Sequence, residues 1–295
     1  MFDYKSLQAL AAVIDQQSFE KAAEKIFITQ SAISQRIKSL ENYYGQPLLI
    51  REVPYAPTTL GQMLLSHYHK AKLLEDDTSA RLTMHVERAR LAIAINRDSL
   101  DIWFPKVFQS LGKQNTILLE VITDDQDVTL DYFKKGLVSA CVSTTEKPVS
   151  GCRVDFLGYM DYLLVASPDF KRQYFNKAAD YKQNLINAPA VIFDAKDNLH
   201  ALYLERFFDI HNEAPNYHIV PSVHGFKQFT TLGYGYALIP HIDIKKELQS
   251  KKLVELFPKK IWRMPLYWHS WQIQTEQYTH FNKLVVSVAK NILGQ

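Results

Sequence analysis

The chain has 295 residues, 47% of them hydrophobic, and a formal net charge of +3. This length is sufficient for two buried cores, because single cores rarely exceed about 250–300 residues. No run approaches the roughly 18 consecutive apolar residues of a membrane span, and residues 1–5 lack the start of a secretion signal. These features argue against a membrane or secreted protein and predict a cytoplasmic one, whereas a pI near 8.6 neither requires nor excludes binding of nucleic acid.

Three helices are predicted within the first 45 residues. Apolar side chains recur at helical spacing in three runs: Leu7, Leu10, Ala11 and Ile14; Phe19, Ala22, Ala23 and Ile26; Ile33, Ile37, Leu40 and Tyr44. Ser18 and Thr29 are N-cap candidates for the second and third helices, and Gly45 ends the third. The second and third helices are thus joined by a tight turn, as in a helix-turn-helix.

The third helix presents a polar face opposite its apolar one, made of Gln30, Ser31, Ser34, Gln35 and Lys38. Amides pair bidentately with adenine, and hydroxyls reach phosphates or base edges, so this face suits a major groove. Taken alone, a polar helix face is more simply a solvated one. Three helices with this spacing and a tight second turn favour DNA binding.

A small hairpin wing is predicted after Gly45, with Arg51 placed to meet a phosphate. Residues 1–58 carry six Lys or Arg and six Asp or Glu. Because this domain is formally neutral, DNA binding must rest on a few placed residues and on two copies acting together.

Two segments carry a close resemblance to LysR-type transcriptional regulators, namely residues 18–25 (SFEKAAEK) and 29–41 (TQSAISQRIKSLE). Within that family the chain is similar to the ArgP branch, also called IciA or LysG, in residues 7–10, 28–37, 45–49 and 53–54. Weaker similarity continues at Asn96 and in residues 98–100, 162–163, 239–241, 246–248 and 266–269. The wing departs from the family pattern, with Leu49 in place of the usual Phe and no second arginine.

This resemblance implies a winged helix-turn-helix (residues 1–58), a dimerising linker helix (59–87) and an effector domain like a periplasmic binding protein (88–295). It also implies lysine or arginine as the effector. The expected partners are double-stranded DNA, that effector, further copies of the chain in a dimer or homotetramer, and RNA polymerase.

A long helix is predicted from residue 59 to about residue 87, where Pro is absent and Gly61 lies in the first turn. Its apolar positions alternate at spacings of four and three, in the series Leu60, Leu64, His67, Ala71 and Leu74. This pattern indicates a coiled-coil seam between protomers over the first half of the helix.

The fold class expected beyond residue 88 is α/β, because short apolar runs alternate with helix-like segments. The runs are 91–95, 117–122 and 140–142 in a first lobe (about 88–161 and 268–295), and 162–166, 190–193, 217–220 and 237–240 in a second lobe (about 162–267). They predict a parallel sheet and two lobes, with residues 267–269 as a strand returning to the first lobe.

Effectors bind at the carboxyl ends of parallel strands, beside helix N-termini. The candidates at these ends are Asn96, Asp98, Ser99, Thr123, Asp124, Asp125, Ser143, Thr144, Phe193, Asp194, Ser222 and His224. Acids there fit a cationic ligand, and helices starting at Ser99, Ser143 or Thr144 fit its carboxylate, although each residue is also an ordinary helix cap. Asp98 and Asp194, one from each lobe, are the candidates for ammonium contacts.

No catalytic residue, cofactor or metal site is predicted. The Ser-x-x-Lys spacings at Ser18 and Ser110 lack companion motifs, and Cys141 and Cys152 are expected to be free thiols. Two alternatives stay open: a DNA-binding architectural protein that ignores effectors, and a solute-binding protein or enzyme that uses the α/β domain alone.

Overall fold

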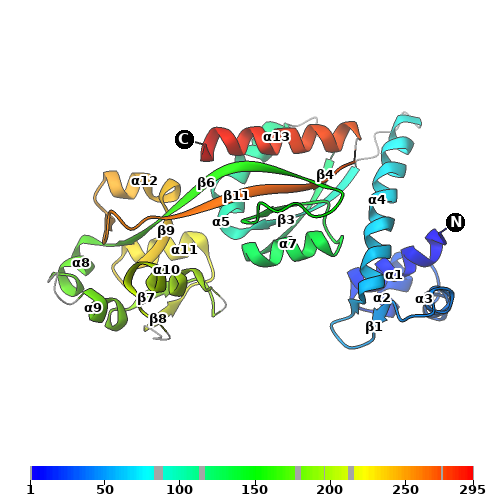
Figure 1. Cartoon of the computed structure of the whole chain (residues 1–295), viewed down its shortest axis with the longest axis horizontal. Helices are drawn as coiled ribbons and strands as arrows, with labels where there is room; N and C mark the ends of the chain where they lie inside the picture. The colour runs from blue at the N-terminus through cyan, green and yellow to red at the C-terminus, as the bar shows by residue number, and fades with distance from the viewer. Residues whose placement is uncertain are drawn as a thin grey trace.

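The computed structural model describes residues 2–82, 89–112, 117–176, 181–195, 197–211, 216–273 and 275–294. A helical N-terminal domain, one long helix and a C-terminal α/β domain follow one another along the chain (Figure 1). Among the described residues, no helix is both long and apolar enough to cross a bilayer.

The N-terminal domain contains α1 (Tyr4–Gln16), α2 (Phe19–Lys25), α3 (Gln30–Tyr44) and a hairpin of β1 (Leu49–Ile50) and β2 (Ala56–Pro57). The predicted caps are confirmed: the Ser18 hydroxyl accepts a hydrogen bond from Lys21 N and the Thr29 hydroxyl accepts one from Ala32 N. Gly45 ends α3 with a φ of 67°, in the left-handed region that glycine adopts at little cost. The hairpin confirms the predicted wing.

The long helix α4 (Thr59–Leu82) packs first against its own N-terminal domain. Leu64 and Leu65 are buried in that domain's core, and the ring of His67 lies beside Phe2 and Tyr4. Of the residues assigned to the seam, Leu64 is thus buried by the same chain and His67 is hydrogen-bonded to Tyr4 of α1, whereas pairing of α4 with a second chain stays a prediction. Met63 and Leu74 remain 67% and 49% exposed, and residues 83–87 of the predicted helix lie outside the described residues.

The C-terminal domain is built on a sheet in the order β10-β6-β11-β5-β3-β4, with β9 also paired to β6. Its strands are β3 (Ala89–Asn96), β4 (Ile117–Asp124), β5 (Ala140–Ser143), β6 (Cys152–Ala166), β9 (Ala237–Pro240), β10 (Val254–Glu255) and β11 (Trp262–Trp271); β7 (Ala190–Ile192) and β8 (Tyr217–Ile219) form a separate pair. The prediction of a parallel sheet holds for β3, β4 and β5 and for β7 with β8, but β6, β9, β10 and β11 are antiparallel. The sheet is mixed.

Two long strands, β6 and β11, run side by side from one lobe to the other (Figure 1). Lobe I holds β3, β4, β5 and the start of β6, with α5 (Arg97–Ile102), α6 (Phe104–Leu111), α7 (Gln126–Lys134) and α13 (Glu276–Leu293). Lobe II holds the end of β6, β7 to β10, α8 (Pro168–Tyr174), α9 (Tyr181–Asn187), α10 (Leu199–Phe208), α11 (Val223–Thr231) and α12 (His241–Gln249). The strand predicted at residues 267–269 is confirmed as part of β11.

Lobe I is docked against α4 through the turn that follows α7. His69 Nδ1 donates a hydrogen bond to the carbonyl of Gly136 at 2.7 Å. Gly136 has a φ of 69°, and a Cβ added there would lie 2.5 Å from Cβ of Ser66. The two backbones therefore approach as closely as glycine permits.

Candidate functional site

The first candidate site is the exposed face of α3. Gln30, Ser31, Gln35 and Lys38 are exposed, whereas Ser34 is half-buried. Ile33, Ile37 and Leu40 point the other way and are buried in the domain core. The structure thus brings the predicted polar side chains to one face, with Ser34 at its margin.

One neighbour of this face, Phe27, was not found from the sequence. Phe27, in the turn before α3, is 94% exposed, and its φ of 56° turns the chain between the two helices. Ser31 Oγ lies 3.0 Å from Thr29 Oγ1, so one of its hydrogen bonds is made within the helix start. An exposed aromatic ring beside a polar helix face offers apolar contact of the kind that thymine methyl groups accept.

The wing residue Arg51 is tied to α3. Its Nη2 donates to Oε2 of Glu41 at 3.1 Å, and the other oxygen of Glu41 accepts from Leu48 N at 3.0 Å. Arg51 stays exposed, so its guanidinium faces solvent, with its charge partly matched by Glu41. The wing therefore contributes less free positive charge than the sequence alone indicates.

The second candidate site is the interlobe junction, which we define as the carboxyl ends of β3, β4 and β7 with the first turns of α5 and α11. Because β3 pairs in parallel with β4, Asn96 lies beside Asp124. Arg97 Nη1 of lobe I donates to Oδ2 of Asp194 in lobe II at 2.9 Å and lies 3.5 Å from Oδ1 of Asp125. Four of the predicted candidates therefore lie at this junction, namely Asn96, Asp124, Asp125 and Asp194.

Asp98 lies nearby, but its carboxylate already has a partner. The hydroxyl of Tyr162, on β6, donates to Oδ2 of Asp98 at 2.5 Å. Burial is the largest influence on this carboxyl and raises its pKa to about 6, although the hydrogen bond from Tyr162 acts in the opposite direction. Asp98 thus fastens the first turn of α5 to the strand that joins the lobes.

Two buried polar atoms at the start of α5 have no partner. Asn96 Oδ1 and Ser99 Oγ are buried without a hydrogen bond to any described residue, and Asn96 does not cap the helix with its side chain. Leaving such atoms unsatisfied costs about 1–3 kcal/mol each. A ligand or water that supplies a donor to Asn96 and a partner to Ser99 would remove that cost.

The other predicted effector residues differ in their surroundings. Ser143 and Thr144 do not start a helix, so that expectation is wrong: β5 is followed by a loop in which the Ser143 hydroxyl accepts from Thr145 N. Ser222 caps α11 by accepting from Gly225 N, and His224 is exposed in the first turn of that helix. Thr123 is exposed. Asp124 and Phe193 do lie at the junction: Asp124 accepts from the hydroxyl of Tyr132, and the Phe193 ring lies under Arg97.

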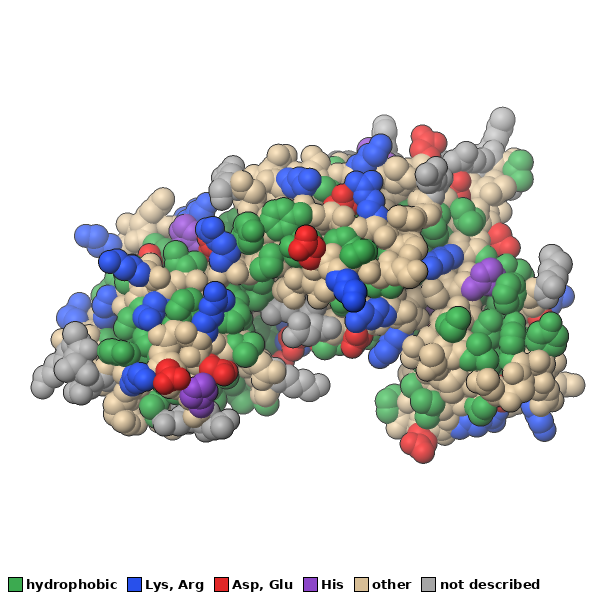
Figure 2. Space-filling model, in the orientation of Figure 1, with side chains coloured by type: hydrophobic (Ala, Val, Ile, Leu, Met, Phe, Trp, Pro, Cys, Tyr) green, Lys and Arg blue, Asp and Glu red, His purple; other side chains and the backbone are tan. Residues whose placement is uncertain are grey.

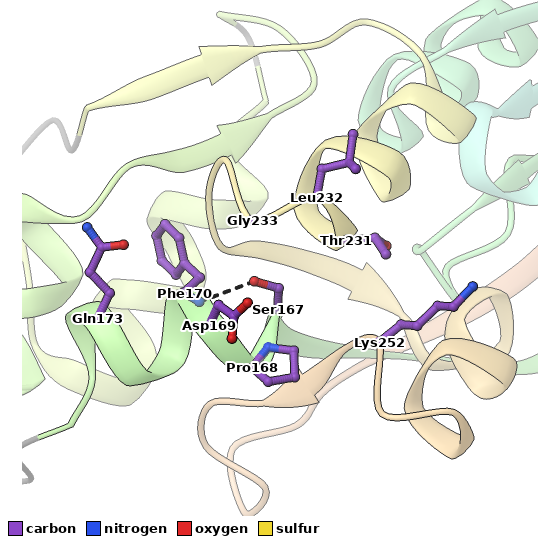
Figure 3. A pocket seen from close by; sticks show the side chains of 9 residues that line it. All are labelled: Ser167, Pro168, Asp169, Phe170, Gln173, Thr231, Leu232, Gly233 and Lys252. Carbon is purple, nitrogen blue, oxygen red and sulfur yellow. Dashed lines mark hydrogen bonds between the residues drawn. The ribbon is translucent and has the colours of Figure 1, made fainter.

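Two cavities lie away from the junction. One of about 1380 Å³ is bounded by the N-terminal domain, α4 and lobe I, in the region where Figure 2 shows a recess between the two domains. The other, of about 410 Å³, lies in lobe II between α8 and the turn after α11 (Figure 3). There the Ser167 hydroxyl caps α8 by accepting a hydrogen bond from Phe170 N.

Comparisons with known proteins bear on both sites. Residues 4–62 match the family described as "Bacterial regulatory helix-turn-helix protein, lysR family". The chain is 38% identical to the HTH-type transcriptional regulator ArgP of Vibrio cholerae over 295 residues, 99% of each chain. Among solved structures, ArgP from Mycobacterium tuberculosis has a TM-score of 0.86 at 33% identity, and full-length LysG from Corynebacterium glutamicum with bound effector Arg has 0.81 at 30% identity. Both structural alignments cover 99% of both chains.

Proposed function

Because this chain belongs to the LysR family of bacterial helix-turn-helix regulators, we propose that α3 and the wing bind operator DNA while a basic amino acid binds at the interlobe junction. As a member of that family, the chain is a DNA-binding transcriptional regulator and not an enzyme. We retain residues 1–58, 59–87 and 88–295 as its DNA-binding, linker and effector-binding parts.

The proposal that α3 binds DNA rests on the separation of the two faces of this helix. Its apolar residues are committed to the core, so Gln30, Gln35 and Lys38 are free to enter a major groove. Gln35 is assigned to a base edge, because an amide pairs bidentately with adenine. Lys38, the hydroxyls of Ser31 and Ser34, and Arg51 are assigned to the phosphate backbone or neighbouring base edges.

A neutral DNA-binding domain needs a second copy to gain affinity, and α4 is the element we assign to pairing. Met63 and Leu74 are exposed, and eleven residues correspond to about three helical turns, so both lie on one side of the helix. A second α4 packed on that side would cover them. We propose a dimer formed in this way as the unit that assembles into a tetramer, and RNA polymerase as a further partner at the promoter.

The effector half rests on the chemistry of the interlobe junction. Asp125 and Asp194 already hold a guanidinium group there, and the similar LysG structure holds Arg as its effector. A basic amino acid supplies the same cation, while its α-amino and carboxylate groups would meet the unpartnered Asn96 and Ser99. Asp98 joins this set as a carboxylate held within reach by Tyr162.

One experiment tests the proposed DNA binding directly. The operator is the sequence that the wild-type chain enriches from a random DNA pool, and affinities for it and for random DNA are measured by fluorescence anisotropy. We expect Gln35→Ala to lower operator affinity by about 1–3 kcal/mol and to leave random DNA unchanged, whereas Arg51→Ala weakens both. Asn42→Ala, an exposed amide two turns further along α3, is the control. Equal losses on both DNAs for Gln35→Ala would show that this residue does not read bases.

The proposed effector binding is tested by thermal unfolding of the full chain in the presence of each of the common amino acids. L-arginine or L-lysine is expected to raise the melting temperature, because a ligand that binds only the folded state stabilises it. If no amino acid does so, the chain acts as an architectural DNA-binding protein and the assigned effector is wrong.

A further inference from the structure

Arg97 connects the two lobes at the place where we assign the effector's cation. It is the first residue of α5 in lobe I, and its Nη1 donates to Asp194 of lobe II at 2.9 Å. The same nitrogen lies 3.5 Å from Oδ1 of Asp125. The side chains of Arg97 and Asp194 are only 32% and 29% exposed, so the pair is partly shielded from water.

An aromatic ring completes the surroundings of this guanidinium. Cζ of Arg97 lies 4.4 Å from the centre of the Phe193 ring, the residue before Asp194. A planar cation stacked on an aromatic face and paired with carboxylates is a recognition set for guanidinium groups in general. Nothing in this set depends on the guanidinium belonging to the chain itself.

The carboxylates here repel one another and so favour a cation among them. Burial raises the pKa of Asp125, the charge of Arg97 opposes this, and Asp194, Asp124 and Asp197 raise the pKa further. Asp125 is also the N-cap residue of α7, yet its side chain makes no capping hydrogen bond to the described backbone. Its carboxylate is directed to Arg97 instead of to the helix, which is unusual for an Asp at this position.

We propose that Arg97 is an internal occupant of the effector's cation subsite. In the absence of effector, its guanidinium binds Asp194 and Asp125 and holds the lobes together; the guanidinium or ammonium group of a basic amino acid binds by displacing it. This inference rests on the proposed function, because it places the cation of that effector. It also makes Arg97 a determinant of affinity: the chain senses only concentrations high enough to compete with its own side chain.

If Arg97 competes with the effector, its removal should raise the affinity for L-arginine. A partly exposed ion pair and a cation–π contact together correspond to about a tenfold factor in affinity. A ligand that does not have to displace Arg97 should bind more tightly by that factor. By titration calorimetry on the full chain, we expect Arg97→Ala to bind L-arginine about tenfold more tightly than wild type. L-citrulline, which has the shape of arginine without its charge, should gain nothing. Arg97→Gln serves as a second variant if Arg97→Ala is poorly folded.

The matched control is Arg263→Ala on β11, which removes another arginine from an aspartate, because Arg263 donates two hydrogen bonds of 2.9 Å to Asp161 on β6. It is expected to leave L-arginine binding unchanged. If Arg97→Ala or Arg97→Gln instead binds L-arginine more weakly than wild type, Arg97 holds the effector's carboxylate and the proposal is overturned.

A second measurement separates this inference from the proposed function. Methylguanidinium carries the cation of arginine without its amino acid part, and it should raise the melting temperature of Arg97→Ala but not that of wild type. If it does so while no amino acid binds either chain, the cation subsite stands and the assigned effector is wrong. If it stabilises neither chain, or both equally, Arg97 does not occupy a cation subsite.

Discussion

Gly136 offers a direct test of how the DNA-binding half is joined to the effector half. We expect Gly136→Ala to be destabilising for two separable reasons. The backbone there has a φ of 69°, and an added Cβ would lie 2.5 Å from Cβ and 2.6 Å from Cα of Ser66 on α4. The left-handed conformation costs a residue with a Cβ about 1–2 kcal/mol, and overpacking against a helix adds about 1–3 kcal/mol.

The chain contains a matched control for this substitution. Gly151 has a φ of 71°, and a Cβ added there meets nothing within 4 Å, so Gly151→Ala carries only the conformational cost. In urea unfolding of the full chain, Gly136→Ala is expected to lose about 2–5 kcal/mol and Gly151→Ala about 1–2 kcal/mol. If the two losses are equal, α4 does not pack on this turn in solution, and the close approach described above is wrong.

Three further substitutions or reagents test single residues. Burial raises the pKa of Asp98 to about 6, so the free energy of unfolding falls as pH rises from about 4 to 6. Asp98→Asn should therefore stabilise the chain by up to about 3 kcal/mol at pH 8 and by nothing below pH 4. An equal effect on urea unfolding at both pH values would contradict this. Burial also raises the pKa of the Cys141 thiol, so a disulfide reagent such as DTNB should label it only after unfolding, and rapid labelling of the native chain would contradict its burial. Glu41→Gln keeps an acceptor for Leu48 N but removes the charge beside Arg51; random-DNA affinity at low salt should rise about two- to fivefold, and no rise would show that Arg51 does not meet phosphate.

Features set by neighbouring residues were predictable from the sequence. Ser18, Thr29 and Gly45 act within one or two turns of their own positions, so their residue types alone predict where the helices begin and end. The same holds for the apolar cores of β3 and β9, which are short runs buried on both sides. Family resemblance then supplied what such local patterns do not, namely the order of the domains.

Features set by distant contacts were not predictable. Arg97 meets Asp194 across 97 positions, and no local pattern marks an arginine in a helical first turn as an interlobe bridge. The burial of Leu64 within its own chain was missed for the same reason, because the apolar spacing on α4 does not say whether a side chain packs on its own N-terminal domain or on a partner. A helix was expected after β5 because parallel sheets return through helices. The chain instead returns from β5 to the start of β6 through a loop, and β11, which is antiparallel to both strands, fills the place between them.

The helix α7 connects the interlobe junction to α4, which gives effector binding a physical path to the DNA-binding domain. Asp125 at its start contacts Arg97, and Gly136 just past its end contacts Ser66 and His69. Its nine residues span about 14 Å, and a packed helix moves as a rigid body.

A shift of Asp125 on displacement of Arg97 must therefore be accommodated at Gly136, where a methyl group has no room. Coupling by this path predicts that Gly136→Ala changes the ratio of operator affinities with and without L-arginine, beyond any effect on operator affinity alone. Gly151→Ala should keep the wild-type ratio. If Gly136→Ala keeps it as well, the signal reaches the DNA-binding domain by another route, such as the long strands β6 and β11.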